Sequence, residues 1–306
     1  MTDRGVALRE LQSELQRRRL SCGAWAAVAS SSQASIETTC YALLALGTAA
    51  AESVSRAQSF LLRNQNSNGS WPVFSGDDED GCWVTALAAI ALRDLVPAIP
   101  ARLRAYDWLL RTTGRESDWL WRWKFRTADR HVRFDPDKSG WPWFPDTVSW
   151  VVPTAFAILA LDQLPCTCGG LEQVPGRTET GIQMLLDRSC PAGGWNAGNG
   201  VVYGEPLSAH ADDTAVALLA LHARCQSDAV MRAIAFLDSS TSMLRAPWSL
   251  AWTILALAAH GRPVTVLQER LASFPSLTGG EDISTLAVAC LALDHRRALA
   301  VFGITT

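Results

Sequence analysis

The sequence lacks the features that would place it across a membrane or on a nucleic acid. No uninterrupted run of about 18 apolar residues occurs, so we expect no membrane-spanning helix. Charged residues make up only 19% of the chain, the formal net charge is -3, and no long block of one sign occurs, which disfavours nucleic acid as a partner. The polar N-terminus has no apolar signal-peptide core, so we expect a cytoplasmic location.

The eight cysteines show neither a disulfide framework nor a complete metal-binding spacing. Most lie inside apolar runs, and without a secretion signal we interpret them as free, buried thiols. This includes Cys166, Cys168 and Cys190, for which no fourth ligand is evident. The chain is instead rich in hydrophobic residues, at 48%, and in tryptophan, with thirteen copies. It therefore has ample material for a large core.

One pattern recurs along the chain: a Gly-Trp turn, a polar or aromatic stretch, and then Thr or Ser opening an Ala/Leu-rich run. Four copies have the turn, at Trp25, Trp71, Trp141 and Trp195, and two later copies, with runs near 250–260 and 283–293, lack it. The runs are nearly apolar all round, which is typical of fully buried helices. The Thr, Ser and Asp residues before them are N-cap types.

Amphipathic segments between these runs predict outer helices with one solvated face. They cover residues 6–19, 51–64, 98–113, 177–188, 226–239 and 263–273. Six outer–inner pairs could form an open array, but an open array needs polar caps at both ends, and the last inner run is as apolar as the others. We therefore predict an all-α fold, a single closed (α/α)6 toroid of six helical hairpins over residues 1–306.

Two insertions precede inner helices and should lie on the rim where those helices begin, one at 114–147 and one at 190–209. The first is rich in Trp and Arg, and the second in Gly. Two interpretations of Arg122, Arg126 and Arg130 stay open: they bind a diphosphate or carboxylate, or they form a solvated helix face.

In a closed ring the starts of the inner helices converge on one mouth. The groups gathered there would be Glu37, Asp80, Cys82, Trp83, Trp150, His210, Asp212, Asp213, Trp248, Trp252, Glu281 and Asp282. Aromatic faces stabilise cations by about 0.5–2 kcal/mol each, so an acid among tryptophans suits carbocation chemistry. A sugar site would also use Trp and paired carboxylates. The aspartates could instead be simple N-caps, and the turn tryptophans structural.

The segment from Gln65 to Trp71 fits the QxxxGxW repeat of squalene–hopene-type cyclases. The chain thus resembles the terpenoid-cyclase and protein-prenyltransferase toroid superfamily. The segment from His210 to Ala215 resembles the DxDD-T-A motif of class II terpene cyclases, with His210 in the first position. The resemblance implies that Asp212 protonates an alkene or epoxide, with Asp213 and His210 tuning its acidity.

The function implied is that of a class II terpene cyclase-like isomerase or lyase. It would cyclise or isomerise an apolar polyene or an isoprenoid diphosphate in a pocket lined by Trp83, Trp150, Trp248 and Trp252. No cofactor is implied, although a diphosphate substrate could bring Mg²⁺ with it. Because the family places its site between two helical domains and only one is found here, rim loops, a homodimer partner or a second subunit would have to close the cavity.

Three other functions remain open. One is a non-catalytic toroid that binds an isoprenoid, a peptide or a protein. Another is a glycoside-active toroid. The third is a zinc prenyltransferase-like subunit, because Asp80-Gly81-Cys82 resembles the Asp-x-Cys zinc ligands of that family. The third zinc ligand should lie one repeat later, where Pro153 stands, so we predict no metal site.

Overall fold

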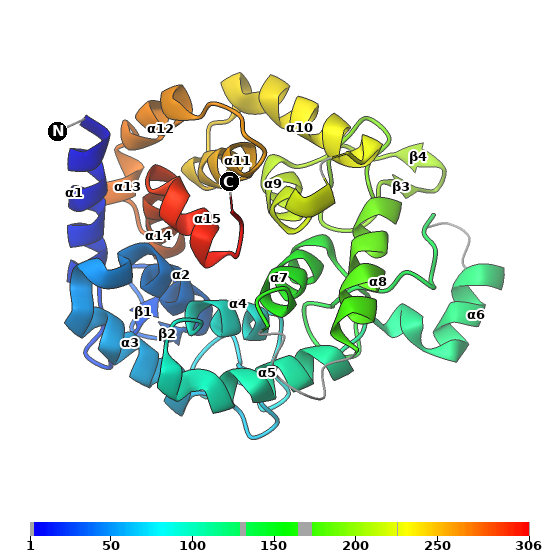
Figure 1. Cartoon of the computed structure of the whole chain (residues 1–306), viewed down its shortest axis with the longest axis horizontal. Coiled ribbons are helices and arrows are strands. Elements are labelled where there is room, and N and C mark those ends of the chain that lie inside the picture. Colours follow the sequence, from blue (N-terminus) through cyan, green and yellow to red (C-terminus); the bar gives the residue numbers. More distant parts are fainter. Residues whose placement is uncertain (1–2, 129–132, 165–172, 225, 306) are drawn as a thin grey trace.

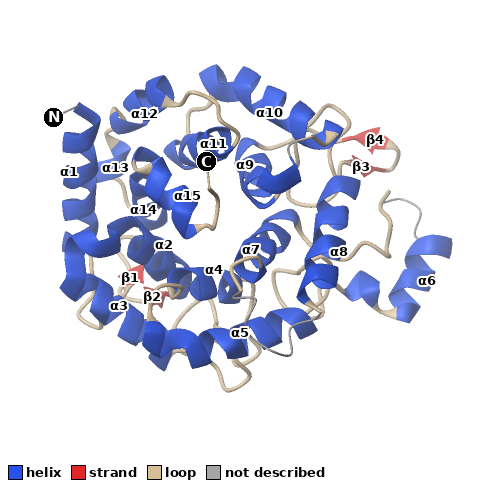
Figure 2. Cartoon of the chain, in the orientation of Figure 1, coloured by secondary structure: helices blue, strands red, loops and turns tan. Residues whose placement is uncertain are grey.

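The computed structural model describes residues 3–128, 133–164, 173–224 and 226–305. Its helices form two concentric layers (Figures 1 and 2). The inner helices are α2 (Ile36–Leu46), α4 (Val84–Ala91), α7 (Val151–Leu161), α9 (Ala211–Ala220), α11 (Pro247–Ala259) and α14 (Ile283–Leu293). The outer helices are α1 (Asp3–Arg17), α3 (Ala51–Arg63), α5 (Ile99–Arg111), α8 (Val174–Asp187), α10 (Asp228–Ser240) and α12 (Thr265–Ala272). The predicted all-α toroid of alternating outer and inner helices is confirmed.

The inner ring is closed, because α14 packs against α2 as well as against α11. A repeated backbone hydrogen bond marks four of the six joints: the N–H at the start of an inner helix donates to a carbonyl in the turn of the next repeat. The pairs are Ile36 to Val73, Trp83 to Trp143, Val151 to Ala197 and, from the last repeat to the first, Ile283 to Ala27. The same bond that joins consecutive repeats therefore joins the two ends of the chain.

Each of the four turn tryptophans, which we call the joint tryptophans, holds the two helices of one hairpin together. They are Trp25, Trp71, Trp141 and Trp195, and each is at most 2% exposed. Each indole N–H donates to a leucine carbonyl at the end of the outer helix before it, on Leu15, Leu61, Leu109 and Leu185. Each backbone N–H donates to the hydroxyl of Thr39, Thr85, Thr154 or Thr214. The threonines thus hold the turns from inside the inner helices and do not act as the N-caps that the sequence suggested.

The full QxxxGxW copy explains why its Gln and Gly are needed. The Gln65 amide donates to Gly69 O and to Ala101 O of the next outer helix, at 2.8 Å each, which links the turn to α5. Gly69 has φ +95°, and a Cβ there would lie 2.5 Å from the carbonyl oxygen of Arg104. Only glycine lets the turn and the next outer helix approach so closely.

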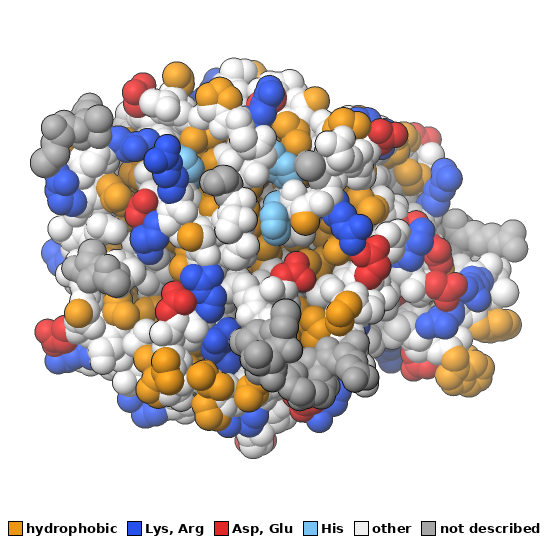
Figure 3. Space-filling view, viewed as in Figure 1, with side chains coloured by type: hydrophobic (Ala, Val, Ile, Leu, Met, Phe, Trp, Pro, Cys, Tyr) orange, Lys and Arg blue, Asp and Glu red, His pale blue; other side chains and the backbone are white. Residues whose placement is uncertain are grey.

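The C-terminal segment covers the end of the ring where the inner helices finish. Helix α15 (His295–Val301) lies over the centre in Figure 1, and Figure 3 shows the same face. Arg297 donates to the carbonyls of Leu44 and Ala45 at the end of α2, at 2.6 and 2.7 Å. Phe302, 1% exposed, packs its ring 6.5 Å from Phe156 and 6.3 Å from Trp252. This end of the ring is therefore filled by the chain's own C-terminal residues.

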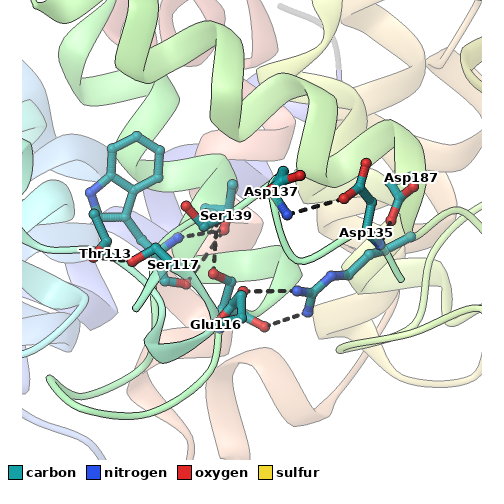
Figure 4. Close-up of polar contacts among 12 residues, drawn as sticks. Thr113, Glu116, Ser117, Asp135, Asp137, Ser139 and Asp187 are labelled. Atoms are coloured by element: carbon teal, nitrogen blue, oxygen red, sulfur yellow. Dashed lines mark hydrogen bonds and ion pairs between the residues drawn. The ribbon is translucent and has the colours of Figure 1, made fainter. Parts of the chain in front are cut away.

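The two predicted insertions carry small elements of their own. Residues 114–147 contain η3 (Arg115–Ser117) and α6 (Trp119–Thr127), and residues 190–209 contain the hairpin β3 (Val201–Val202) and β4 (Glu205–Pro206). A buried ion pair anchors the first insertion: Arg188 at the end of α8 donates to Glu116 at 2.8 Å, with exposed fractions of 2% and 0% (Figure 4). Asp187 accepts a hydrogen bond from the backbone N–H of Asp135 at 2.8 Å.

The remaining elements are short. They are β1 (Trp25–Ala26), β2 (Ala34–Ser35), η1 (Gly47–Ala50), η2 (Val96–Ala98), η4 (His222–Arg224), η5 (Thr241–Met243) and α13 (Ser276–Gly279). None of the helices in the described ranges has both the length and the apolar character needed to cross a bilayer.

Candidate functional site

A cavity of about 300 Å³ lies at the starts of the inner helices. Its lining comes from α2, α4, α7, α9, α11 and the first insertion, and consists of Glu37, Tyr41, Trp83, Trp143, Val152, Phe156, Asp212, Asp213, Val216, Trp248 and Trp252. Six of these eleven residues are aromatic and three are carboxylic acids. Of the groups predicted to meet at one mouth, the structure brings six into this lining: Glu37, Asp212, Asp213, Trp83, Trp248 and Trp252.

The aromatic rings form one connected wall. Trp83 contacts Trp143 edge to face, with centroids 5.3 Å apart, and lies 5.3 Å from Phe156. Trp252 lies 5.8 Å from Trp248 and 5.9 Å from Tyr41, both edge to face. Such packing fixes ring orientation and presents several π faces to a common volume. A cation formed inside the cavity would meet those faces from more than one side.

Glu37 is the acid of the α2 wall. It stands in the first turn of α2, behind the N-cap Ser35, whose hydroxyl accepts from Thr38 N. No other described residue hydrogen-bonds its carboxyl. Burial, and to a lesser degree the nearby Asp282 carboxylate, raises the pKa of Glu37 from 4.5 to about 7. The carboxyl is therefore substantially protonated near neutral pH, facing an aromatic volume.

Asp212 and Asp213 form the facing wall, because α9 lies three positions from α2 in either direction around the ring. Both stand in the first turn of α9, whose N-cap is His210, so neither is an N-cap. Asp282, by contrast, is the N-cap of α14 and accepts from Thr285 N at 3.1 Å.

The histidine that replaces the first aspartate of the class II motif pairs with Asp213, not with Asp212. Its Nδ1 lies 2.8 Å from Asp213 Oδ2, and its side chain is 59% exposed. Burial raises the pKa of Asp213, the His210 hydrogen bond opposes that rise, and the Asp212 charge adds to it. His210 therefore acts at the edge of the cavity, on the second aspartate of the pair.

Several residues proposed from the sequence lie elsewhere. Trp150 is the N-cap of α7 and is not among the residues that line the cavity. Arg122 and Arg126 stand on α6 and pair with Asp137, because the insertion carries that helix outside the ring. Arg130 lies outside the described residues. The insertion reaches the cavity through an aromatic ring, Trp143, instead of through arginine.

Three aromatic lining residues, Tyr41, Trp143 and Phe156, were not predicted from the sequence, nor were the lining valines Val152 and Val216. Tyr41 and Phe156 are large aromatic residues inside runs otherwise built from Ala, Leu and Ile, and Tyr41 follows Glu37 by four residues, on the same helix face. Trp143 stands two residues after a joint tryptophan, at the position whose carbonyl receives the inter-repeat hydrogen bond. These positions can be recognised as cavity-lining only when the closed ring shows which helix faces point inward.

The zinc interpretation finds no support in the geometry of Cys82. Its thiol is fully buried and lies 3.6 Å from the Trp71 carbonyl oxygen. Burial raises the pKa of Cys82 to about 12, which disfavours the thiolate that zinc binds. Within the described ranges, no group of three or more His, Cys, Asp or Glu side chains is arranged to hold a metal ion.

A larger groove of about 660 Å³ lies outside this cavity, between the 66–81 turn and the first insertion. Asp77, Asp78, Asp80 and Asp146 line it together with Trp108 and Arg111. Inner-helix starts and packed aromatic rings do not meet at this groove as they do at the smaller central cavity. The central cavity is therefore the better candidate site.

Comparisons with known proteins support the fold alone. No family model and no curated protein sequence matches the chain. Solved structures do match over nearly the full length of both chains. An α-amylase from Clostridium perfringens has 8% identity and a TM-score of 0.66, covering 94% of this chain and 97% of that one.

Two further structural neighbours differ in activity. An α-1,6-mannanase from Salegentibacter, solved as an inactive variant with two consecutive aspartates replaced by alanine, has 13% identity and a TM-score of 0.63, covering 97% and 100%. A type II terpene cyclase from Scytonema has 13% identity and a TM-score of 0.62, covering 97% and 98%. At such identities the neighbours show that this chain has the fold of α/α toroid proteins, a fold that carries both activities.

Proposed function

We propose that the chain is an acid-catalysed enzyme that creates a carbocation on an apolar polyene inside the central cavity, in the manner of class II terpene cyclases. The observation that carries the proposal is the Glu37 carboxyl. Its surroundings raise its pKa to about 7, so a protonated fraction persists near neutral pH, and it shares the cavity with six aromatic rings. A proton donor and a cation-stabilising surface share one volume.

The proposed reaction begins when Glu37 gives its proton to one carbon of an alkene or to an epoxide oxygen. In an alkene the π electrons form the new C–H bond. In an epoxide a lone pair of the oxygen forms the new O–H bond, and the C–O bond then breaks with its electron pair left on oxygen. Either route leaves a tertiary cation. Trp83, Trp248 and Trp252 stabilise that cation while a second double bond attacks it. Loss of a proton to the Asp212–Asp213 wall ends the reaction with a neutral, cyclised or isomerised product.

This assignment moves the proton donor away from the residue named by the class II motif. The motif gives that role to Asp212, whereas burial favours the protonated form at Glu37. Asp212 is then proposed as the counter-charge across the cavity, with Asp213 and His210 as the group that accepts the proton. The three residues keep a place in the site, in changed roles.

The lining also narrows the substrate class. Apart from three carboxyls and the Tyr41 hydroxyl, the lining side chains are aromatic or aliphatic, and no Lys or Arg is among them. A diphosphate would lack a cationic partner there, and a sugar would find polar partners only at the three carboxyls, the Tyr41 hydroxyl and the indole N–H groups. An uncharged polyene, or its epoxide, fits these surroundings best.

Glycoside hydrolysis is the second candidate, and a specific observation favours it. Most of the structural neighbours named by activity act on polysaccharides, and the mannanase variant mentioned above is inactive with two consecutive aspartates replaced. Asp212 and Asp213 are likewise consecutive. In this candidate Glu37 is the general acid and the aspartate pair activates water across the cavity.

The test incubates purified protein separately with linear polyenes, with their terminal epoxides, and with α-mannan, α-glucan and β-glucan oligosaccharides. Products are identified by mass spectrometry. We expect turnover of a polyene or epoxide, reduced on the order of 10²–10⁴-fold in Glu37→Gln and in Asp212→Asn. Glu281→Gln is the matched control, because Glu281 is an exposed rim acid outside the cavity lining.

Turnover of an oligosaccharide alone would replace the first candidate with the second. Binding of a polyene without product, unchanged in Glu37→Gln, would identify a non-catalytic toroid instead.

A further inference from the structure

Helix α6 (Trp119–Thr127) differs from the inner and outer helices of the ring in having no buried residue. It projects at the edge of the molecule beyond α8 (Figure 1), and Figure 3 shows hydrophobic and basic side chains together at that edge. Trp119 is 77% exposed, Leu120 52% and Trp123 59%. Exposing two tryptophans and a leucine on one short helix is unfavourable in water unless another surface covers them.

The exposed residues share one face. At about 100° per residue, Trp119, Leu120 and Trp123 fall within one third of the helix circumference. Arg122 and Arg126 follow on one flank and Lys124 on the other, and α6 contains no acidic residue. The result is an apolar strip bordered by cations on both sides.

The opposite face of α6 holds the helix to the protein. Trp121 and Phe125 point there: their rings are 5.9 Å apart, and Phe125 lies 5.0 Å edge to face from Phe134. The Lys124 ammonium lies 4.4 Å from the centroid of the Trp121 ring. Because this inner face is satisfied within the chain, the Trp119–Leu120–Trp123 face is the side left for an outside partner.

We propose that α6 docks the protein onto a membrane surface that contains anionic lipids. Tryptophan side chains settle at the boundary between headgroups and acyl chains, and flanking Lys and Arg side chains bind anionic headgroups. A second copy of the chain fits less well, because two α6 helices meeting by this face would bring Arg122, Lys124 and Arg126 of each together, offset in each copy by the one acid, Asp137, that pairs with both arginines. The insertion that carries α6 also supplies Trp143 to the cavity, so the docking element and the mouth belong to one segment.

The test measures co-sedimentation with vesicles of phosphatidylcholine alone and of phosphatidylcholine mixed with phosphatidylglycerol. We expect binding to the anionic vesicles that weakens with added salt. Replacing both tryptophans, Trp119→Ser with Trp123→Ser, should weaken it by on the order of tenfold or more. Lys124→Gln should weaken it about fivefold.

A matched control replaces two apolar residues elsewhere on the surface whose exposed fractions are comparable to those of Trp119 and Trp123. Val96 and Val266 are 74% and 75% exposed, and Val96→Ser with Val266→Ser should bind vesicles as the parent does. No binding to anionic vesicles, or equal binding by the double tryptophan variant, would overturn the proposal. A concentration-dependent dimer without lipid, lost in that variant, would assign the face to a second copy. None of these readouts depends on catalysis.

Discussion

The joint tryptophans and the tryptophans of the cavity differ in what surrounds their indole nitrogens. At the joints, all four indole N–H groups donate to a leucine carbonyl at 2.6–2.8 Å. In the cavity, no described residue accepts a hydrogen bond from the indole N–H of Trp83, Trp143, Trp248 or Trp252, and the indole nitrogen of Trp252 is buried. One set uses its polarity to hold hairpins together, while the other presents ring faces to an open volume. Tryptophans of the scaffold and tryptophans of the site are therefore distinguished by whether the indole N–H has an acceptor.

Removing a joint tryptophan should give the largest effect on stability. Trp71→Ala deletes a fully buried ring and leaves the Leu61 carbonyl without its partner, so we expect the free energy of unfolding to fall by about 3–5 kcal/mol. Trp71→Phe keeps most of the ring but loses the hydrogen bond. Its free energy of unfolding should therefore lie between those of Trp71→Ala and the parent. Urea unfolding followed by circular dichroism measures both. If Trp71→Ala lowers the free energy of unfolding by less than about 1 kcal/mol, the joint tryptophans do not have the structural role given to them here.

Replacing a cavity tryptophan should affect turnover more than folding. Trp248 is partly exposed and makes edge-to-face contacts with Tyr41 and Trp252, so Trp248→Leu keeps an apolar side chain but loses the π face. We expect turnover to fall about 2- to 30-fold, with a stability loss smaller than that of Trp71→Ala. Steady-state kinetics and urea unfolding on the same preparations check this. The comparison fails if the two variants lose stability equally and the folded fraction of Trp248→Leu turns over normally.

The cavity, unlike the joints, should also make stability depend on pH through Glu37. Its pKa is about 7 in the folded protein against an ordinary glutamate value of 4.5, so the folded state binds the proton more tightly than the unfolded state. Its contribution to stability is complete below pH 4.5 and is lost as the pH rises through about 7. Relative to Glu37→Gln, the parent should therefore lose stability between about pH 5 and about pH 8. Unfolding curves at both values test this, and a parallel pH dependence in the two proteins would contradict it.

Much of the scaffold was predictable because it repeats. The inner run 283–293 and the outer segment 51–64 were placed within a residue of α14 and α3, since apolar periodicity marks each hairpin and a Gly-Trp turn marks four of them. Ring closure followed from the apolar last helix. The hydrogen bonds of Thr39 and Thr85 to the turns were missed, because a Thr at a helix start has the same pattern whether it caps its own helix or holds a neighbouring turn.

The site was less predictable, since it depends on which side chains face inward across the ring. Glu37 appeared only as one acid among several, and its raised pKa arises from burial against groups of other repeats. Arg122 and Arg126 were assigned by composition, whereas the Glu116–Arg188 ion pair and the aromatic back of α6 determine where the insertion points.

The most direct test of the account is whether the cavity prefers a cation to a neutral group of the same shape. Binding of a farnesyl chain that ends in a dimethylammonium group can be compared by calorimetry with binding of its uncharged carbon isostere, for the parent and for Trp248→Leu. The account predicts that the ammonium binds more tightly by about tenfold or more, on the order of two cation–π contacts, and that Trp248→Leu reduces this preference. Equal binding of the two compounds, or a preference that Trp248→Leu leaves unchanged, would contradict it.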